Sequence, residues 1–235
     1  MKKINETLGR KLQKISSTKI ILFGYCLIIL VGTLLLSLPI ATSGDGVTGV
    51  TDAFFTATSA TCVTGLVRFD TYTHWTLFGQ IVILCLIQIG GLGFMTVAIA
   101  LVMIARRKIG INSRMIMQDS IAAPQVGGIV RMTKLVLVGT AIVEGTGALL
   151  LCFHFCPRFG IGKGIYFSIF HSISAFCNAG FDLMGIEEQF SSLTAEAGNW
   201  YINLIIMALI VIGGLGFFVW HDLIQSRFRF SKMRL

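Results

Sequence analysis

The chain has 235 residues and a formal net charge of +8, and 54% of its residues are hydrophobic while only 13% are charged. Its mean hydropathy of +0.82 lies far from that of a soluble globular domain, so the sequence predicts a membrane protein. The basic residues flank apolar runs and are not interleaved with aromatic residues, which argues against nucleic-acid binding.

Four apolar segments are long enough to cross a bilayer, at residues 20–38, 77–105, 135–155 and 200–220. The first exceeds the apolar core of a signal peptide, and we interpret it as an uncleaved membrane helix. Two shorter segments, 52–60 and 165–175, cannot cross. Each precedes a stretch of small residues, which favours re-entrant half-helices that face a pore.

The basic residues indicate the orientation. Segments 1–19, 106–134 and 223–235 hold every lysine and arginine except Arg68, Arg158 and Lys163. If four segments cross, these three basic segments lie on one side, and the positive-inside rule places both termini in the cytoplasm. We expect two membrane units, at 20–105 and 135–222, between a cytoplasmic N-terminal arm (1–19), a basic cytoplasmic loop (106–134) and a basic cytoplasmic tail (223–235).

The two units repeat one another. A shift of 115 residues places Phe55 on Phe170, Ser59 on Ser174, Cys62 on Cys177 and Gly65 on Gly180. A shift of 123 then superposes IGGLGF at 89–94 on IGGLGF at 212–217. Each copy reads as an outer helix, a short re-entrant helix, an extended turn and an inner helix, and the copies run parallel.

The turns carry the predicted chemistry. A ring of backbone carbonyls can replace the water of a monovalent cation without adding fixed charge, and a glycine supplies the dihedral freedom that such a turn needs. The C-terminal end of each half-helix adds partial negative charge. The predicted ion-binding residues are Thr61, Cys62, Val63, Thr64 and Gly65 in the first turn and Phe176, Cys177, Asn178, Ala179 and Gly180 in the second. The plainer alternative is that Gly65 and Gly180 only shape surface turns.

Other residues invite weaker hypotheses. Glu144 lies in an apolar helix, where it either makes a buried hydrogen bond or takes part in ion passage. We expect His171 to pack or hydrogen-bond, Arg68 to be an exposed charge near the first turn, and the GGLGF glycines to allow close helix packing or a kink.

The six cysteines form no paired CxxC motifs, and we expect them to be small buried hydrophobes. A metal or disulfide role stays open for Cys152 and Cys156. We predict no tightly bound cofactor and no metal beyond the permeating ion, and no catalytic set with plausible spacing suggests an enzyme.

The motifs TSATCVTGL, SAFCNAGFD and GGLGF resemble those of the Trk/Ktr/HKT superfamily of potassium transporters, most closely the KtrB type of bacterial membrane subunit. The resemblance implies an all-α membrane protein of K⁺-channel-like repeats in the bacterial plasma membrane, with one filter glycine in each of four repeats. It also implies potassium uptake, a cytoplasmic KtrA/TrkA-like nucleotide-binding regulator and a homodimer. Sodium is a candidate coupling ion, and the sequence leaves the choice between K⁺ and Na⁺ open.

The chain departs from that pattern because it holds two units where the family has four. Three explanations stay open: a fragment of a longer chain, a ring of two copies, or a separate chain that supplies the rest. The alternative to potassium uptake is therefore a truncated or structural half-subunit that does not conduct alone.

Overall fold

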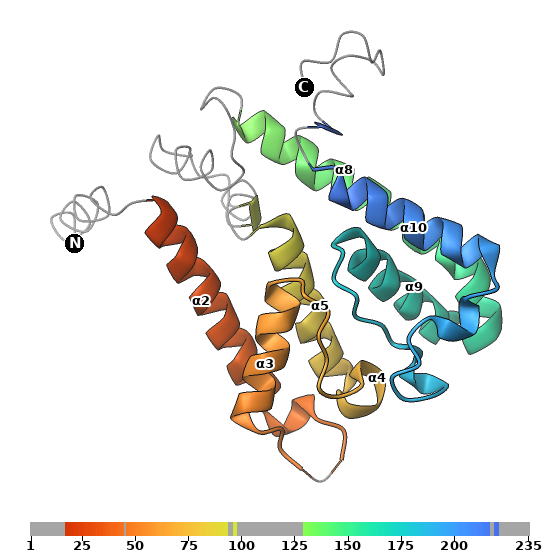
Figure 1. The fold of residues 1–235 in the computed structure, drawn as a ribbon, viewed down its shortest axis with the longest axis horizontal. Helices are drawn as coiled ribbons and strands as arrows, with labels where there is room; N and C mark the ends of the chain where they lie inside the picture. The colour runs from red at the N-terminus through yellow and green to blue at the C-terminus, as the bar shows by residue number, and fades with distance from the viewer. Residues whose placement is uncertain (1–16, 45, 94–95, 98–128, 217–218, 221–235) are drawn as a thin grey trace, which may run out of the picture. The chain divides into compact units, whose positions relative to one another are not determined.

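The computed structural model describes residues 17–44, 46–93, 96–97, 129–216 and 219–220 (Figure 1). Over this part of the chain the structure is helical and contains no strand; an isolated bridge joins Thr42 and Trp75. The predicted all-helical class is therefore confirmed. The basic arm at 1–16, most of the basic loop and the tail at 221–235 lie outside the described residues, so their predicted orientation remains a prediction.

The two longest helices are α2 (Ser17–Leu36) and α8 (Ile129–Phe159). Within them, Thr18–Leu36 and Thr133–Phe159 are long and apolar enough to cross a membrane. Both contain the core of a predicted span, although α8 extends beyond residues 135–155 at either end.

Two shorter apolar helices, α5 (Leu77–Leu92) and α10 (Trp200–Gly214), take the places of the other two predicted spans. The apolar segment 77–105 is not one continuous helix, because α5 ends at Leu92 and Gly93 has a φ of +79°. The span predicted to reach residue 220 is likewise interrupted, since α10 ends at Gly214 and Gly216 has a φ of +82°. A glycine in the left-handed conformation ends an α-helix, and the hydropathy of a segment does not predict where such a glycine lies.

The two segments predicted to be half-helices form the short helices α3 (Val50–Thr61) and α9 (Ile161–Phe176), and their re-entrant character stays a prediction. Between these helices lie short elements of the connecting loops. They are η1 (Pro39–Ala41), α4 (Thr71–His74), η2 (Met184–Ile186) and η3 (Thr194–Glu196). Side-chain caps begin two of the helices: Asp70 accepts from the first backbone N–H groups of α4, and Asn199 does so for α10.

The chain divides into two compact units, 1–27 with 93–137 and 28–92 with 138–235. In the larger unit α3 packs against α5, α9 against α10, and α5 against α9 (Figure 1). Its core includes the fully buried side chains of Ile83, Ile87, Phe167 and Phe170. Burial of such side chains, which also come from α2, α3, α8 and α10, holds the two short helices in place.

Close helix contacts recur at equivalent positions of the two halves. A Cβ added to Gly32 would lie 2.7 Å from Leu86, and one added to Gly147 would lie 2.7 Å from Leu209. Gly32 and Gly147 are 115 residues apart, and Leu86 and Leu209 are 123 apart. The same glycine therefore lets the outer helix approach the inner helix in both halves.

The expectation that the cysteines are buried is wrong. Cys26, Cys62 and Cys85 are exposed, and Cys152, Cys156 and Cys177 are only partly buried. In a membrane, an apolar side chain on the outer face of a helix meets lipid and need not pack against protein. An apolar sequence context therefore does not predict burial within the protein.

Candidate functional site

The first turn begins where α3 ends. Val63 N–H donates to Ala60 O at 3.3 Å, and Thr64 N–H donates to Ser59 O at 2.9 Å. This pair of bonds is a Schellman motif, in which the residue after the cap takes the left-handed conformation. That residue is Val63, with a φ of +56°.

The second turn, after α9, repeats this geometry. Asn178 N–H donates to Ala175 O at 3.0 Å, Ala179 N–H donates to Ser174 O at 2.8 Å, and Asn178 has a φ of +58°. Each partner is 115 residues from its counterpart in the first turn. The two half-helices therefore end in the same backbone conformation although their side chains differ.

The two predicted glycines follow in matching conformations and lie close together. The φ of Gly65 is +75° and that of Gly180 is +73°. A Cβ added to Gly65 would lie 2.6 Å from Ala179 O, and one added to Gly180 would lie 3.6 Å from the Cα of Gly65. The structure thus brings the two turns into contact, although they are far apart in the sequence.

Backbone strain in these turns exceeds what the sequence suggests. A β-branched residue at positive φ is unusual and is found where the surroundings hold it, so Val63 stores strain that Asn178 largely avoids. The prediction assigned the special dihedrals to the glycines alone. An asparagine at position 178 was a usable signal for a left-handed residue, whereas valine at position 63 carries none.

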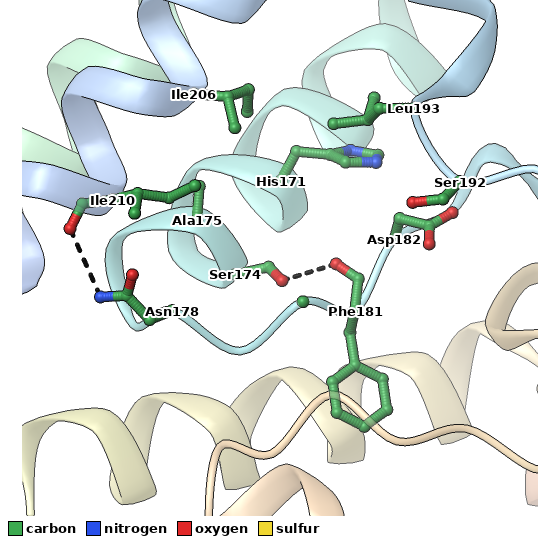
Figure 2. Close-up of a pocket in the computed structure, with 11 residues that line it drawn as sticks. His171, Ser174, Ala175, Asn178, Phe181, Asp182, Ser192, Leu193, Ile206 and Ile210 are labelled. Atoms are coloured by element: carbon green, nitrogen blue, oxygen red, sulfur yellow. Dashed lines mark hydrogen bonds between the residues drawn. The ribbon is translucent and has the colours of Figure 1, made fainter.

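Side chains support both turns. Ser59 Oγ and Thr64 Oγ1 are 2.9 Å apart, and Ser174 Oγ donates to Phe181 O at 2.5 Å (Figure 2). Behind the second turn, buried His171 meets Phe167 O through Nδ1 at 2.8 Å and accepts from Leu183 N–H through Nε2 at 3.3 Å. These two partners select the neutral Nδ1–H tautomer, and the expected packing and hydrogen bonding of His171 are confirmed.

The GGLGF glycines of the inner helices pack against the ends of the half-helices. A Cβ on Gly90 would lie 2.0 Å from Thr61 O, and one on Gly213 would lie 1.9 Å from Phe176 O. Gly91 of the first half packs against the second turn, since a Cβ on Gly91 would lie 2.5 Å from Cys177 Sγ. Close packing, as expected from the sequence, thus fixes where each turn begins.

A cavity of about 210 Å³ adjoins the second turn (Figure 2). Its walls include Asn178 and Gly180 of the turn and Ile206 and Ile210 of α10. Subtraction of 123 from the two isoleucine numbers gives Ile83 and Ile87 of α5, which are fully buried, whereas Ile210 is 40% exposed. The second half therefore leaves open a surface that is covered in the first half.

Two of the charged residues considered above have partners. Gln88 Nε2 donates to both carboxylate oxygens of Glu144, each at 3.1 Å, which agrees with the hydrogen-bonding interpretation of Glu144. Arg68 is exposed, as expected, and forms an ion pair with Asp52 in the first turn of α3.

Asp70 is a buried residue that sequence reasoning missed. Its Oδ1 accepts from Tyr72 N–H and Thr73 N–H, and its Oδ2 accepts from Phe190 N–H at 3.0 Å. The capping role could be inferred from an aspartate before a short polar helix. The bond to Phe190 joins a loop of the first half to a loop of the second half and has no local signal in the sequence.

Comparison with known proteins places the chain in a family. The family model TrkH, described as cation transport protein, matches residues 30–234. The chain is 41% identical over 223 residues to the potassium/sodium uptake protein NtpJ of Enterococcus hirae, covering 95% of this chain and 48% of that protein. It is 42% identical over 217 residues to the Ktr system potassium uptake protein B of Bacillus subtilis, covering 92% and 47%.

A third relative, the Ktr system potassium uptake protein D of Bacillus subtilis, is 32% identical over 228 residues and is matched over 49% of its length. The chain thus spans about half the length of the curated relatives that it matches. The family comprises cation transporters and is not an enzyme family. The chain belongs to the TrkH family of cation transport proteins.

Proposed function

We propose that this chain provides half of a potassium-uptake pore, in which two backbone turns act as part of a selectivity filter. The relatives are named as potassium or potassium/sodium uptake proteins, which supports the choice of ion. The observation that carries the proposal is the contact between two turns of equal geometry, each at the C-terminal end of a short helix. A half-helix that ends at an ion path presents partial negative charge to it, which favours a cation.

The proposed architecture is two tandem K⁺-channel-like units, each with an outer helix, a pore loop and an inner helix. α2, α3 and α5 form the first unit, and α8, α9 and α10 form the second. Equivalent glycine contacts between outer and inner helices, and between inner helices and half-helices, support it. The proposed ligands are the backbone carbonyls of Thr61–Gly65 and Phe176–Gly180, since carbonyl rings replace the hydration shell of K⁺.

Two turns do not close a carbonyl ring. The open surface of α10 at Ile206 and Ile210, beside the second turn, supports the addition of further units of the same kind. These come either from more chain of the same type or from a second copy. A half-subunit that does not conduct alone is the second candidate, and the half-length match to the relatives favours it.

The remaining assignments follow the family. We propose that the protein lies in the bacterial plasma membrane with cytoplasmic termini, on the basis of the basic segments. A KtrA/TrkA-like cytoplasmic regulator, a homodimeric assembly and coupling to Na⁺ are also proposals. The word "system" in the name of the Bacillus subtilis relative supports a protein with several components.

The first experiment measures rubidium uptake into potassium-loaded liposomes that contain only this purified chain. Gly65→Asp is compared with wild type, because a side chain at Gly65 collides with Ala179 O and a carboxylate alters the charge of the turn. Gly44→Asp is the matched control, since Gly44 also has a positive φ, of +111°, but no atom lies within 4 Å of the added Cβ.

Uptake that Gly65→Asp abolishes and Gly44→Asp preserves would support conduction by self-association of this chain. No uptake from a helical, monodisperse preparation would support the half-subunit. Equal uptake by wild type and Gly65→Asp would overturn the filter proposal.

A further inference from the structure

The carboxylate of Glu144 carries a negative charge that its hydrogen bonds from Gln88 do not neutralise. The residue lies in the membrane-crossing part of α8 and is only 9% exposed. Its carboxylate accepts from the neutral amide of Gln88, and no ion pair to it is formed within the described part of the chain. A carboxylate in apolar surroundings is strongly destabilised unless a positive charge compensates it.

Two buried oxygen atoms, one on α5 and one on α8, lack hydrogen-bond partners within the described residues. They are Gln88 Oε1 and Thr140 Oγ1, and Thr140 is only 2% exposed. Buried polar atoms without partners are rare in folded proteins and call for an explanation. Together with the buried carboxylate of Glu144, they point to a missing positive charge.

The helix geometry brings these oxygens together. The buried positions of α8 include Val136, Thr140, Glu144 and Leu151, which recur at the spacing of one helix face. Thr140 is therefore about one turn from Glu144, a rise of roughly 6 Å along the axis at 1.5 Å per residue. Because helical side chains lean toward the N-terminus, the Glu144 side chain leans toward Thr140.

Gln88 completes the set from the neighbouring helix. Its Nε2 donates to both carboxylate oxygens at 3.1 Å, and its unpaired Oε1 belongs to the same amide group. The unpaired oxygen therefore lies near the carboxylate, where the two groups can share one cation.

We propose that Glu144, Gln88 and Thr140 form a buried site for a monovalent cation, separate from the carbonyls of the two turns. One carboxylate balances one positive charge, whereas a divalent ion would leave a net charge in apolar surroundings. Hard monovalent cations take carboxylate, amide and hydroxyl oxygens. Ser172 Oγ donates to Glu144 O at 2.7 Å, so the site is tied to α9 immediately before the second turn.

The test measures thermal unfolding of the full chain in detergent in NaCl, KCl or choline chloride at equal ionic strength. Wild type is expected to unfold at a higher temperature in Na⁺ or K⁺ than in choline. Glu144→Gln is expected to lose this difference, and exposed Glu188→Gln to retain it. The readout needs no transport, so it is independent of the proposed filter.

Thr140→Val keeps the shape of the side chain and removes one proposed ligand. It is therefore the variant to compare with wild type if Glu144→Gln does not fold. The half-saturating cation concentration is expected to rise about tenfold, the size of effect that loss of one buried polar contact gives. A cation-dependent shift that persists unchanged in Glu144→Gln or Thr140→Val would overturn the proposal.

Infrared spectroscopy provides a second test, which asks whether a proton rather than a metal cation neutralises Glu144. If a proton neutralises Glu144, wild type in saturating Na⁺ or K⁺ shows a protonated-carboxyl band that Glu144→Gln lacks. That band would overturn the cation site. Its absence, together with the cation-dependent stability, would support the site.

Discussion

At the scale of single residues, the turns show how one backbone conformation is reached with different side chains. Val63 and Asn178 have φ values of +56° and +58°, and Gly65 and Gly180 have +75° and +73°. The strain is smallest at the glycines and largest at valine. Val63 is held there by the bond to Ala60 O and by packing against the core.

Gly65→Ala is expected to destabilise the protein for two reasons that a control can separate. Positive φ alone costs about 1–2 kcal/mol for a residue with a Cβ, and at Gly65 the Cβ also meets Ala179 O at 2.6 Å. At Gly44, with a φ of +111°, the Cβ meets nothing within 4 Å. In thermal unfolding, Gly65→Ala should therefore lose more stability than Gly44→Ala. Equal losses would show that the contact between the turns contributes nothing.

The environment of His74 leads us to expect that the stability of the protein depends on pH. Its Nε2 lies 2.9 Å from Thr48 Oγ1, its ring stacks on Phe69, and burial lowers the pKa of His74 below its ordinary value of 6.5, an effect that the nearby Asp52 carboxylate opposes. Folding therefore favours the neutral ring. The contribution of His74 to stability is complete above pH 6.5 and is lost as the pH falls below 6.5 toward the lowered pKa.

The measurement is the unfolding temperature of wild type and His74→Gln between pH 8 and pH 5. Wild type is expected to lose more stability than His74→Gln over this interval, because glutamine does not titrate. Parallel curves for the two proteins would contradict the assignment.

At the scale of helices, the inner helices depend on glycine at the points where a half-helix ends. Gly90 lies against Thr61 O and Gly213 against Phe176 O. Gly93 and Gly216 then take positive φ and end the regular helix. The GGLGF motif thus combines a close contact with a break, whereas sequence reasoning offered them as alternatives.

Gly90→Ala tests the contact. A Cβ there would lie 2.0 Å from a backbone oxygen, so α5 and α3 must separate, which we expect to cost about 1–3 kcal/mol. Gly145→Ala in α8 is the matched control, because nothing lies within 4 Å of its Cβ. That change should be neutral or should stabilise by up to about 1 kcal/mol through helix propensity. Denaturant titrations of both variants compare the two effects, and a stable Gly90→Ala would refute the close packing.

Helices were predicted from the sequence more reliably than their ends. The half-helices at 52–60 and 165–175 are present and are longer by a few residues at the N-terminal or C-terminal end. Periodicity and composition report the body of a helix, but its end depends on one or two dihedral angles. Sequence reasoning therefore allowed a kink in GGLGF but did not locate the end of α5 at Leu92.

At the scale of the whole chain, residues distant in sequence connect loops of the two halves. Asp70 caps α4 through Oδ1 and accepts from Phe190 N–H through Oδ2, and a Cβ on Gly185 would lie 2.0 Å from Oδ1. One carboxylate thus serves both halves. The loop around Phe190 passes close enough for this contact only because Gly185 has no side chain.

Asp70→Asn is expected to loosen this connection, because an amide has one acceptor oxygen in place of two and its NH₂ group cannot accept. Hydrogen exchange at the Phe190 amide should become at least about tenfold faster, in line with the loss of a bond to a charged group. Glu188→Gln, an exposed change in the same loop, should leave exchange at Phe190 unaltered. Unchanged protection in Asp70→Asn would remove this carboxylate as the link between the loops.

The sequence by itself determined the helical class, the two half-helices, the positions of the candidate turns and the resemblance to a cation-transport family. These properties follow from local patterns: apolar length, glycine placement and a repeat that can be read by shifting the chain against itself. The tertiary structure decided which residues meet. The contact of Gly65 with Ala179, the exposed cysteines, the strain at Val63 and the oxygens around Glu144 depend on how helices approach one another, and single-sequence patterns do not encode that approach.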